Sequence, residues 1–266
     1  MKRWIAVFLV LLMLGGTCLL PVQAQRLSAD TPTKTPAMIG HKGYSEKYPE
    51  NTALAIEKAA EAGFSGTEAD VRLTKDGVFV LSHDETIETA DGQTLRLSRC
   101  TYEELTAQPL KNEFDTAPVY LCRLEDYLDL CKENDLICFI EIKEYWMIHK
   151  IVELFAMVRE RYEFQKCEIQ SFELLPLLVA RLFFPQARIM LATNEYNFNA
   201  KAAFLLGFDL DMRFDGLTAQ IVEKFHSRNR RVSCFTVNDA TEAKRCAALG
   251  VDFMETDVFP VFPADA

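Results

Sequence analysis

The stretch from Gly66 to Asp84 has the sequence Gly-Thr-Glu-Ala-Asp-Val-Arg-Leu-Thr-Lys-Asp-Gly-Val-Phe-Val-Leu-Ser-His-Asp. It contains two strand-like segments joined by Asp76-Gly77, a dipeptide that favours a two-residue hairpin turn. With that turn, Asp70 lies directly opposite His83. Because side chains alternate between the two faces of a strand, Glu68 and Asp70 share one face. The predicted hairpin therefore places a histidine beside two carboxylates, with opposed Cβ atoms about 5 Å apart.

The link between these two segments is too short for a parallel crossover, so the segment at 78–83 is expected to be an additional antiparallel strand. Apart from it, eight apolar segments are strand candidates: 38–41, 66–71, 136–142, 167–171, 187–192, 207–211, 231–237 and 251–255. They alternate with helical stretches such as 51–62, 146–161, 174–183, 216–228 and 239–249. This alternation predicts an α/β fold, a (β/α)8 TIM barrel with an extra β-hairpin and an inserted segment, 85–123, after the second strand. A doubly wound open sheet is the alternative, and in that fold the first and last strands do not pair.

Three acidic residues, Glu68, Asp70 and Glu141, lie in otherwise apolar strand segments. Acidic side chains are rarely buried unless they are paired or bind a metal. In a barrel enzyme the C-terminal ends of the strands meet on the catalytic face, so these carboxylates should converge. Oxygen ligands favour one hard divalent cation, Mg²⁺ or Ca²⁺, over zinc. The alternative is that the acids are solvated, or that they pair with Lys42 and Lys143.

A series of short motifs follows in order along the chain: His41-Lys42-Gly43, Pro49-Glu50-Asn51-Thr52, Glu68-Ala69-Asp70, Thr74-Lys75-Asp76-Gly77, His83-Asp84, Glu141-Ile142-Lys143, Ser171-Phe172, Phe235-Thr236-Val237-Asn238 and Thr256-Asp257. In this order they resemble the glycerophosphodiester phosphodiesterases, over about Met38 to Asp257. The resemblance implies a phosphoric diester hydrolase on a TIM barrel. It implies three metal ligands, namely Glu68, Asp70 and Glu141. The two histidines of the family match His41 and His83.

The chain departs from this family at two positions. Lys42 stands where the family usually has arginine, and a lysine keeps the positive charge but lacks the planar fork that binds two oxygens at once. Phe235 stands where the family usually has tryptophan, and phenylalanine keeps an aromatic wall without the indole N–H donor. We expect Lys42 and Lys143 to bind the substrate phosphate. The candidates for the substrate pocket are Glu50, Ser171, Phe172 and Phe235.

The helix expected near 51–62 has clear boundaries. Asn51 or Thr52 can cap its start, and Gly63 can end it. A cap gives Asn51 a sufficient structural explanation. Because acids are favoured at a helix start, Glu50 is either a pocket residue or only part of this start.

Hydrolysis of a phosphodiester needs charge neutralisation, a nucleophile and a proton for the departing alkoxide. The unperturbed pKa of imidazole, about 6.5, suits both a general base and a general acid. The resemblance implies that His41 and His83 take these roles and that a glycerol hydroxyl attacks first, giving a cyclic phosphodiester that water opens. The products would be sn-glycerol 3-phosphate and an alcohol. The alternatives are a lysophospholipase D or phosphoinositide phosphodiesterase on the same barrel, or a non-catalytic exported binding protein, which the histidine pair disfavours.

The N-terminal residues have the pattern of an export signal. The basic pair Lys2-Arg3 precedes a mostly apolar stretch, 4–20, and Val22-Gln23-Ala24 provides a small-residue cleavage site. We expect 1–24 to be a signal peptide, 25–36 a polar linker and 37–266 one domain, in a periplasmic or secreted protein. The alternatives are an uncleaved N-terminal membrane anchor, or a lipoprotein modified at Cys18.

Net charge and cysteine usage exclude several classes of partner and site. Loss of the leader removes two positive charges and no acids, so the formal net charge moves from −10 to −12. That charge disfavours binding to nucleic acid and electrostatic binding to an anionic membrane. The expected partner is a small-molecule glycerophosphodiester. The seven cysteines after the leader show no paired short spacing, which disfavours a disulfide framework or a zinc site.

Overall fold

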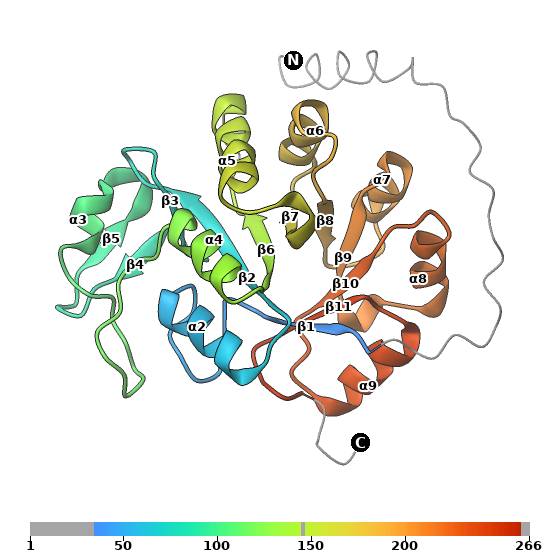
Figure 1. Ribbon diagram of the computed structural model, residues 1–266, viewed down its shortest axis with the longest axis horizontal. Helices are drawn as coiled ribbons and strands as arrows, with labels where there is room; N and C mark the ends of the chain where they lie inside the picture. The colour runs from blue at the N-terminus through green and yellow to red at the C-terminus, as the bar shows by residue number, and fades with distance from the viewer. Residues whose placement is uncertain (1–34, 145–146, 262–266) are drawn as a thin grey trace. The chain divides into compact units, whose positions relative to one another are not determined.

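The computed structural model of the protein describes residues 35–144 and 147–261. Eight parallel strands form a barrel in this part of the chain: β1 (Ala37–Gly40), β2 (Gly66–Leu73), β6 (Ile137–Ile142), β7 (Cys167–Ser171), β8 (Ile189–Thr193), β9 (Asp209–Arg213), β10 (Val232–Phe235) and β11 (Phe253–Thr256) (Figure 1). The first and last strands, β1 and β11, pair in parallel from Ala37↔Phe253 to Gly40↔Thr256. The barrel is therefore closed, which confirms the predicted (β/α)8 fold and excludes the open sheet.

Helices cover the outside of the barrel: α2 (Ala53–Ala62), α4 (Leu124–Glu133), α5 (Ile148–Arg161), α6 (Leu174–Phe183), α7 (Phe198–Leu206), α8 (Ala219–His226) and α9 (Ala240–Leu249). Five of them lie within the helical stretches named from the sequence, whereas α4 and α7 do not. The short helix α7 follows the polar residues Asn194–Asn197 and has a nearly even distribution of apolar side chains. A helix without a distinct apolar face gives a weak periodic signal.

The first barrel helix shows why its sequence folds locally as it does. The side chain of Thr52 accepts a hydrogen bond from the backbone N–H of Ala55 and caps α2, and Gly63 ends the helix in the left-handed conformation, with φ +97°. Thr52 is therefore the cap, and Asn51 is not. Gly43 lies where the loop after β1 meets this helix, and a Cβ atom there would come within 2.7 Å of the Ala55 Cβ. The sequence Gly43…Thr52 thus lets the loop after β1 pack closely against α2.

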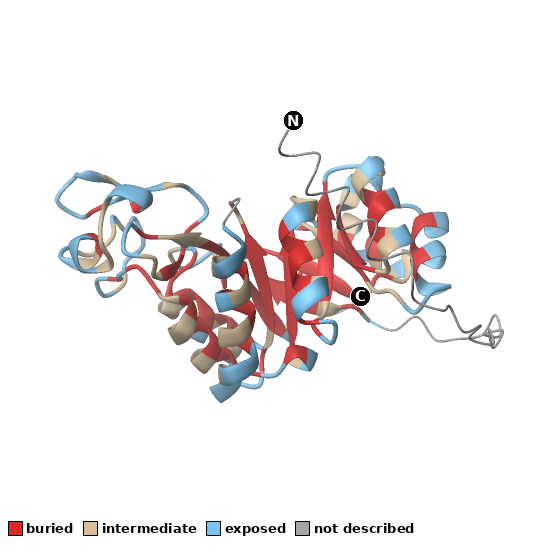
Figure 2. Cartoon of the chain, turned by 90° about the horizontal axis from the view of Figure 1, so that it is seen from above, coloured by how far each residue is buried: buried red, intermediate tan, exposed pale blue. Residues whose placement is uncertain are grey.

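Apolar residues fill both the barrel and the layer between strands and helices. The barrel strands are almost entirely buried, and the exposed residues lie on the outer faces of the helices, on loops and on the inserted segment (Figure 2). Inside the barrel, Ile39, Phe139, Met190 and Phe253 form a separate apolar cluster near the N-terminal ends of the strands. This cluster fills much of one end of the barrel, where Glu168 and Asp209 are also buried and pair with Arg231.

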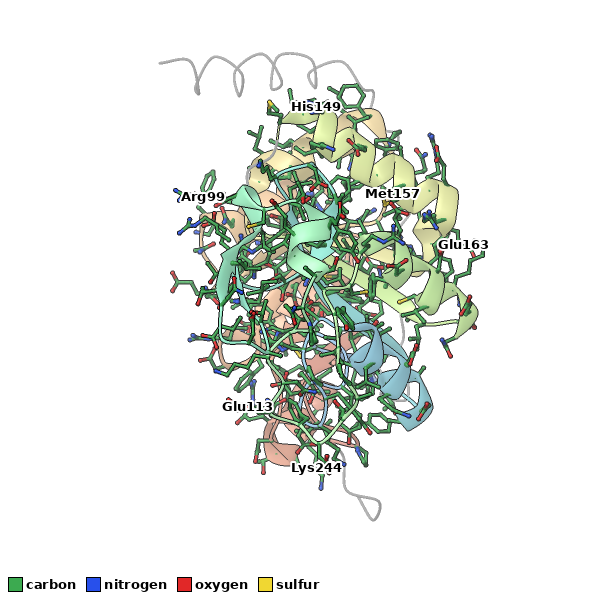
Figure 3. All side chains as sticks on the ribbon, turned by 90° about the vertical axis from the view of Figure 1, so that its left-hand side faces the viewer. Arg99, Glu113, His149, Met157, Glu163 and Lys244 are labelled. Carbon is green, nitrogen blue, oxygen red and sulfur yellow. The ribbon has the colours of Figure 1, made fainter. Side chains whose placement is uncertain are left out.

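A hairpin and an inserted segment follow β2. Strand β3 (Phe79–Leu81) pairs antiparallel with β2, as predicted. The insertion then forms a two-stranded sheet, β4 (Thr86–Glu88) and β5 (Thr94–Arg96), and a short helix, α3 (Tyr102–Thr106). It has an apolar core of its own, formed by Val80, Ile87, Leu97, Leu105 and Leu121. Figure 3 shows this side of the molecule, with Arg99 and Glu113 labelled on the insertion.

Within residues 35–144 and 147–261, no helix has both the length and the apolar character needed to cross a bilayer. The predicted signal peptide, 1–24, and nearly all of the predicted linker, 25–36, lie outside the described residues. Their assignments therefore stay predictions.

Candidate active site

Three carboxylates converge on adjacent strands. Glu68 and Asp70 lie on β2 and Glu141 lies on β6, where Asp70 and Glu141 are register partners. One oxygen from each carboxylate lies within 4.8 Å of the other two, and the side chains are buried. The expected convergence is therefore present, and the alternative of solvated strand ends is excluded for all three.

Glu68 carries the least compensated charge of the set. Its Oε2 accepts a hydrogen bond of 3.0 Å from the backbone N–H of Lys42, whereas its Oε1 is buried without a hydrogen-bond partner among the described residues. Burial, followed by repulsion from Asp70 and Glu141, raises the pKa of Glu68 well above its ordinary value. A buried oxygen without a partner is costly, so this position favours a cation.

Lys143 partly neutralises the other two acids. Its Nζ lies 2.8 Å from Glu141 Oε1 and 3.2 Å from Asp70 Oδ1. Burial lowers the pKa of Lys143, but attraction to Glu141 and Asp70 outweighs it, so the pKa is raised and the ammonium stays charged. For Asp70, burial is likewise outweighed by Lys143 and by a hydrogen bond from Asn51, and its pKa is lowered. The predicted alternative of lysine pairing is thus correct for Lys143.

Asn51 holds Asp70 at two points, a role that the sequence interpretation missed. The Nδ2 of Asn51 donates to Asp70 Oδ2 at 2.9 Å, and its Oδ1 accepts from the backbone N–H of Asp70 at 3.0 Å. Asn51 is buried and left-handed, with φ +57°, a conformation that asparagine adopts more readily than most residues. The only signal in the sequence was an asparagine beside an adequate cap residue, Thr52.

Lys42 and Glu50 form a pair at the edge of the site. The Nζ of Lys42 lies 3.0 Å from Glu50 Oε2, and the lysine side chain is only 13% exposed. Burial lowers the pKa of Lys42, but Glu50, Asp70 and Glu68 together raise it. Glu50 precedes α2 and its side chain contacts Lys42, so it is not merely part of the helix start.

His41 is oriented by a carboxylate that the sequence interpretation did not assign. Its Nδ1 lies 2.7 Å from Asp257 Oδ1, and Asp257 also accepts hydrogen bonds from Ser45 Oγ and Asn238 Nδ2. Burial opposes ionisation of Asp257, but these bonds, led by that from His41, lower its pKa to about 2. Because ionised Asp257 can only accept, Nδ1 carries the hydrogen and Nε2 is left free.

His83 reaches the same cavity through a register different from the predicted one. The pairs are Val71↔Leu81 and Leu73↔Phe79, one residue from the prediction, so Asp70 faces Ser82 and not His83. The predicted register was therefore wrong.

The turn explains this slip. It contains three residues, because Thr74 and Val78 form the last hydrogen-bonded pair. The Thr74 hydroxyl also accepts from the Val78 N–H at 2.9 Å, and Gly77 has φ +80°. This arrangement matches a three-residue hairpin loop with a left-handed glycine, which competes with the two-residue turn. His83 lies beyond the end of β3 and bonds to Asp84 Oδ1 at 2.8 Å.

A cavity of about 170 Å³ joins these groups. Its lining residues come from most of the barrel strands or from the loops after them: His41, Asp70, His83, Glu141, Lys143, Gln170, Phe172, Asp211, Phe235 and Glu255. The rings of Phe172 and Phe235 pack edge to face, with their centroids 5.7 Å apart, and form one wall of the cavity. Both residues were assigned to the pocket from the sequence. Ser171 is different, because its buried hydroxyl donates to Ile142 O and accepts from the Glu173 N–H. Ser171 does not line this cavity.

The deep part of the cavity contains polar residues that the sequence interpretation did not identify. Glu255 and Asp211 are buried, and burial is the largest of the causes that raise the pKa of each well above its ordinary value. Glu255 Oε1 lies 3.4 Å from Gln170 Nε2, and a ring nitrogen of His41 lies within 4.8 Å of the carboxylates of Glu68 and Glu255. The available signal was the one used for Glu68, an acid inside an apolar strand.

The site thus combines oxygen ligands suited to a hard cation, two imidazoles and two ammonium groups around one small cavity. A family model described as the glycerophosphoryl diester phosphodiesterase family matches residues 41–260. A glycerophosphodiester phosphodiesterase of Bacillus altitudinis is 29% identical over 84% of this chain and 94% of its own length. One from Caldanaerobacter subterraneus subsp. tengcongensis is 27% identical, over 83% of this chain and 93% of its own. An Oleispira antarctica phosphodiesterase, solved in complex with the product sn-glycerol-3-phosphate, superposes with a TM-score of 0.75 at 21% identity and covers 84% of this chain and 93% of that one.

Proposed function

The chain belongs to the glycerophosphoryl diester phosphodiesterase family and is thereby a phosphoric diester hydrolase, and on that premise we propose that it hydrolyses glycerophosphodiesters to sn-glycerol 3-phosphate and an alcohol. The main support for placing the reaction at this site is a convergence of side chains in and around one cavity. Three carboxylates, Glu68, Asp70 and Glu141, lie there beside His41 and His83. The Oleispira phosphodiesterase of the same fold binds sn-glycerol-3-phosphate, which supports the proposed product.

The proposed cofactor is one divalent hard cation, Mg²⁺ or Ca²⁺, held by Glu68, Asp70 and Glu141. The residues fit such an ion, because the Glu68 Oε1 is buried without a partner and all three donors are carboxylate oxygens. When bound, the ion would neutralise a non-bridging oxygen of the phosphate. Lys143 pairs with Asp70 and Glu141, and because an ammonium has three N–H donors, its third N–H can donate to the phosphate.

The two histidines divide the proton transfers in the proposed mechanism. His41 acts as the general base, since Asp257 fixes Nδ1 as a donor and leaves Nε2 to take a proton from the attacking hydroxyl. His83 acts as the general acid and protonates the departing alkoxide. Its half-exposed position at the mouth of the cavity, with 45% of the side chain accessible, supports contact with the group that leaves.

Turnover assays test this function. The purified protein should hydrolyse glycerophosphocholine or glycerophosphoethanolamine when Mg²⁺ or Ca²⁺ is supplied, with sn-glycerol 3-phosphate as the product. Lysophosphatidylcholine is the second candidate substrate, because Met147 and Ile148 are 70% and 58% exposed at the start of α5, on the barrel face that carries the site. Hydrolysis of lysophosphatidylcholine alone would establish that second function, and binding without turnover of any diester would establish a non-catalytic protein.

Lys42 is expected to stabilise the phosphate in the transition state. Lys42→Met should lose about 2–4 kcal/mol of transition-state stabilisation in kcat/KM. Lys42→Arg should keep or improve kcat/KM, because Glu50 is 52% exposed and can move to accept a longer side chain. Measurement of kcat/KM for both variants on glycerophosphocholine tests this role of Lys42. An unchanged kcat/KM in Lys42→Met would show that Lys42 does not contact the phosphate.

Asn51→Ala is expected to raise the concentration of cation needed for half-maximal activity about 10–100-fold, because Asp70 loses both of its contacts with Asn51. Activity at saturating cation should change much less. The matched control is Asn229→Ala, because Asn229 is also left-handed, with φ +53°, but exposed. The control shows how much the loss of an asparagine from a left-handed backbone position changes activity by itself. If both variants raised the cation concentration for half-maximal activity equally, a role of Asn51 at the cation would be excluded.

We also propose that the protein is exported, either periplasmic or secreted, after cleavage following Ala24. The proposal rests on the basic pair at 2–3, the apolar stretch 4–20 and the small-residue site at 22–24. N-terminal sequencing of protein from cell fractions tests it. A first residue at Gln25 in an extracytoplasmic fraction is the expected result, and an intact N-terminus in the membrane fraction would indicate the anchor.

A further inference from the structure

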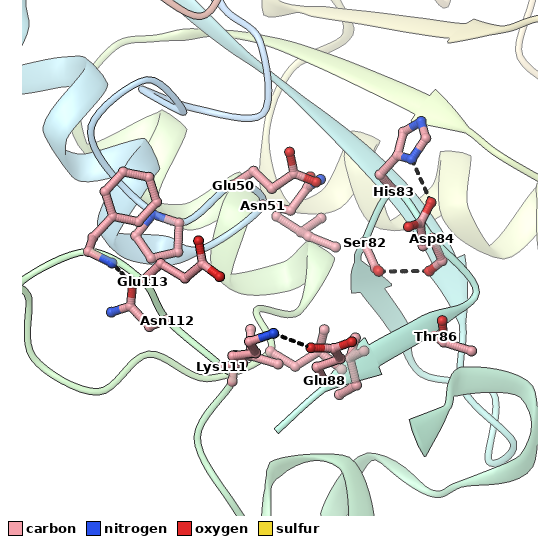
Figure 4. Close-up of a pocket in the computed structure, with 16 residues that line it drawn as sticks. Glu50, Asn51, Ser82, His83, Asp84, Thr86, Glu88, Lys111, Asn112 and Glu113 are labelled. Carbon is pink, nitrogen blue, oxygen red and sulfur yellow. Dashed lines mark hydrogen bonds and ion pairs between the residues drawn. The ribbon is translucent and has the colours of Figure 1, made fainter. Parts of the chain in front are cut away.

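A second and larger cavity, of about 370 Å³, opens beside the proposed active site. It lies between the start of α2 and the inserted segment, and its lining residues are drawn in Figure 4. His83 lines both this cavity and the smaller one that holds the carboxylates. A substrate whose phosphate lies in the smaller cavity can therefore extend past His83 into the larger one.

The walls of this larger cavity combine an apolar floor with carboxylates. The apolar residues are Leu81, Ile87, Leu110, Phe114 and Leu121, and the acids are Glu50, Asp84, Glu88 and Glu113. One lysine, Lys111, is the only lysine or arginine in the described lining. A cavity with this lining suits a group that is both cationic and partly apolar.

Three of the four acids already have partners within the protein. Glu50 pairs with Lys42, Asp84 with His83, and Glu88 with Lys111. Glu113 makes no hydrogen bond or ion pair through its side chain with any residue of the described chain, although Lys111 lies near enough to attract it. In Figure 4 the Glu113 carboxylate lies on the opposite side of the cavity from His83.

Phe114 follows Glu113 in the same loop. Its side chain lines the cavity and is 37% exposed, so the ring is accessible to a bound group. The face of an aromatic ring attracts an ammonium group, and a nearby carboxylate adds to that attraction. Glu113 and Phe114 together therefore provide a carboxylate and an aromatic ring to one cation.

We propose that this cavity binds the leaving alcohol of the substrate and selects a cationic amino alcohol, of the choline or ethanolamine type, through Glu113 and Phe114. The inference rests on the proposed function, because the position of the alcohol follows from His83 as the general acid. Neutral polyols would find an apolar floor in place of hydrogen-bond partners for all their hydroxyls. Phosphorylated alcohols would be repelled by the four acids.

Two substrates that differ in charge alone test the selection. Glycerophosphocholine and the glycerophosphodiester of 3,3-dimethylbutanol have head groups of the same shape, but only the first is cationic. The wild-type protein is expected to prefer glycerophosphocholine about tenfold or more in kcat/KM. Glu113→Gln should lower kcat/KM for glycerophosphocholine about three- to tenfold and leave the neutral diester unchanged, and Phe114→Ala should lower both.

Matched variants control for charge and folding. Glu103→Gln makes the same change of charge in an exposed residue of the same insertion that does not line the cavity. It should leave kcat/KM unchanged for both diesters. Lys111→Gln, which releases Glu88, should increase the preference for the cation. Thermal unfolding of Glu113→Gln should match that of the wild-type protein, because Glu113 has no partner to lose.

Two outcomes separate the possible failures. Equal kcat/KM for the two diesters, or an unchanged ratio in Glu113→Gln, would overturn the selection while leaving the hydrolase function intact. If no diester is hydrolysed, the hydrolase function fails, and the cavity is then tested by calorimetric titration with choline and with 3,3-dimethylbutanol in the presence of Mg²⁺. Tighter binding of choline, weakened by Glu113→Gln, would support the cationic site, and equal binding would overturn it.

Discussion

Removal of divalent cations with EDTA is expected to reduce hydrolysis of glycerophosphocholine to the background of the assay, and excess Mg²⁺ or Ca²⁺ should restore it. Three buried carboxylates within 4.8 Å of one another cannot all be ionised unless positive charge lies between them. Lys143 contacts Asp70 and Glu141 but leaves Glu68 Oε1 without a partner. In the proposed mechanism the cation would therefore both complete the site and neutralise the phosphate.

A second measurement makes this expectation independent of turnover. A cation that binds only the folded protein should raise its stability by about 2.7 kcal/mol at 100 times the dissociation constant. Glu68→Gln should lose this stabilisation and the activity together. Without cation the variant should be at least as stable as the wild-type protein, because the amide removes a buried charge of raised pKa. Full activity in EDTA, with no metal in the purified protein, would disprove the cation requirement.

The barrel and its main carboxylates could be predicted because both depend on a strong local pattern. Most of the eight strands are apolar segments, and the acids of β2 and β6 are polar exceptions within such segments. In a closed barrel such side chains can point only outward into the helix layer or inward to the axis, so acids near the C-terminal ends meet. The fold thus determines the convergence of Glu68, Asp70 and Glu141 without any detail of the loops.

The parts that could not be predicted depend on competition between local structures. Asp76-Gly77 suits two turn types, and the Thr74 hydroxyl, which bonds to the Val78 N–H, favours the longer one. Asn51 and Thr52 can both cap a helix, so the pattern could not show which of them is free to hold Asp70. The first choice is settled by one side-chain hydrogen bond within the turn, and the second by the contact of Asn51 with Asp70 on the neighbouring strand, and a linear pattern of apolar and polar residues contains neither.

The polar residues deep in the barrel could not be predicted for a different reason. Glu255 and Asp211 lie within strands, and an acid in an apolar strand was the signal used for Glu68. The motifs of the family directed attention to Thr256-Asp257 and away from Glu255. Asp257 itself belongs to a recognised motif, but its role in orienting His41 requires the pairing of β1 with β11, which brings the first and last strands of the barrel together.

Substitution of either histidine by alanine is expected to lower kcat for glycerophosphocholine about 10²–10⁴-fold while the fold is retained. His41 and His83 are partly exposed, with 24% and 45% of their side chains accessible, so neither truncation leaves a large cavity in the core. Asp257→Asn should lower kcat as well, because an asparagine side chain can bond to His41 in the wrong tautomer. Circular dichroism and thermal unfolding check the fold of each variant.

The two roles are distinguished by the leaving group. A general acid is needed only when the departing oxygen is a poor leaving group, so His83→Ala should regain most of its activity on a glycerophosphodiester of p-nitrophenol, which departs without protonation. His41→Ala should not, because the attacking hydroxyl still has to lose its proton and the variant lacks the Nε2 that accepts it. Rescue of His41→Ala alone would exchange the two assignments. Near-normal kcat of either variant on glycerophosphocholine would remove that histidine from the mechanism, since a group that transfers a proton in the transition state cannot be lost without a large change in rate.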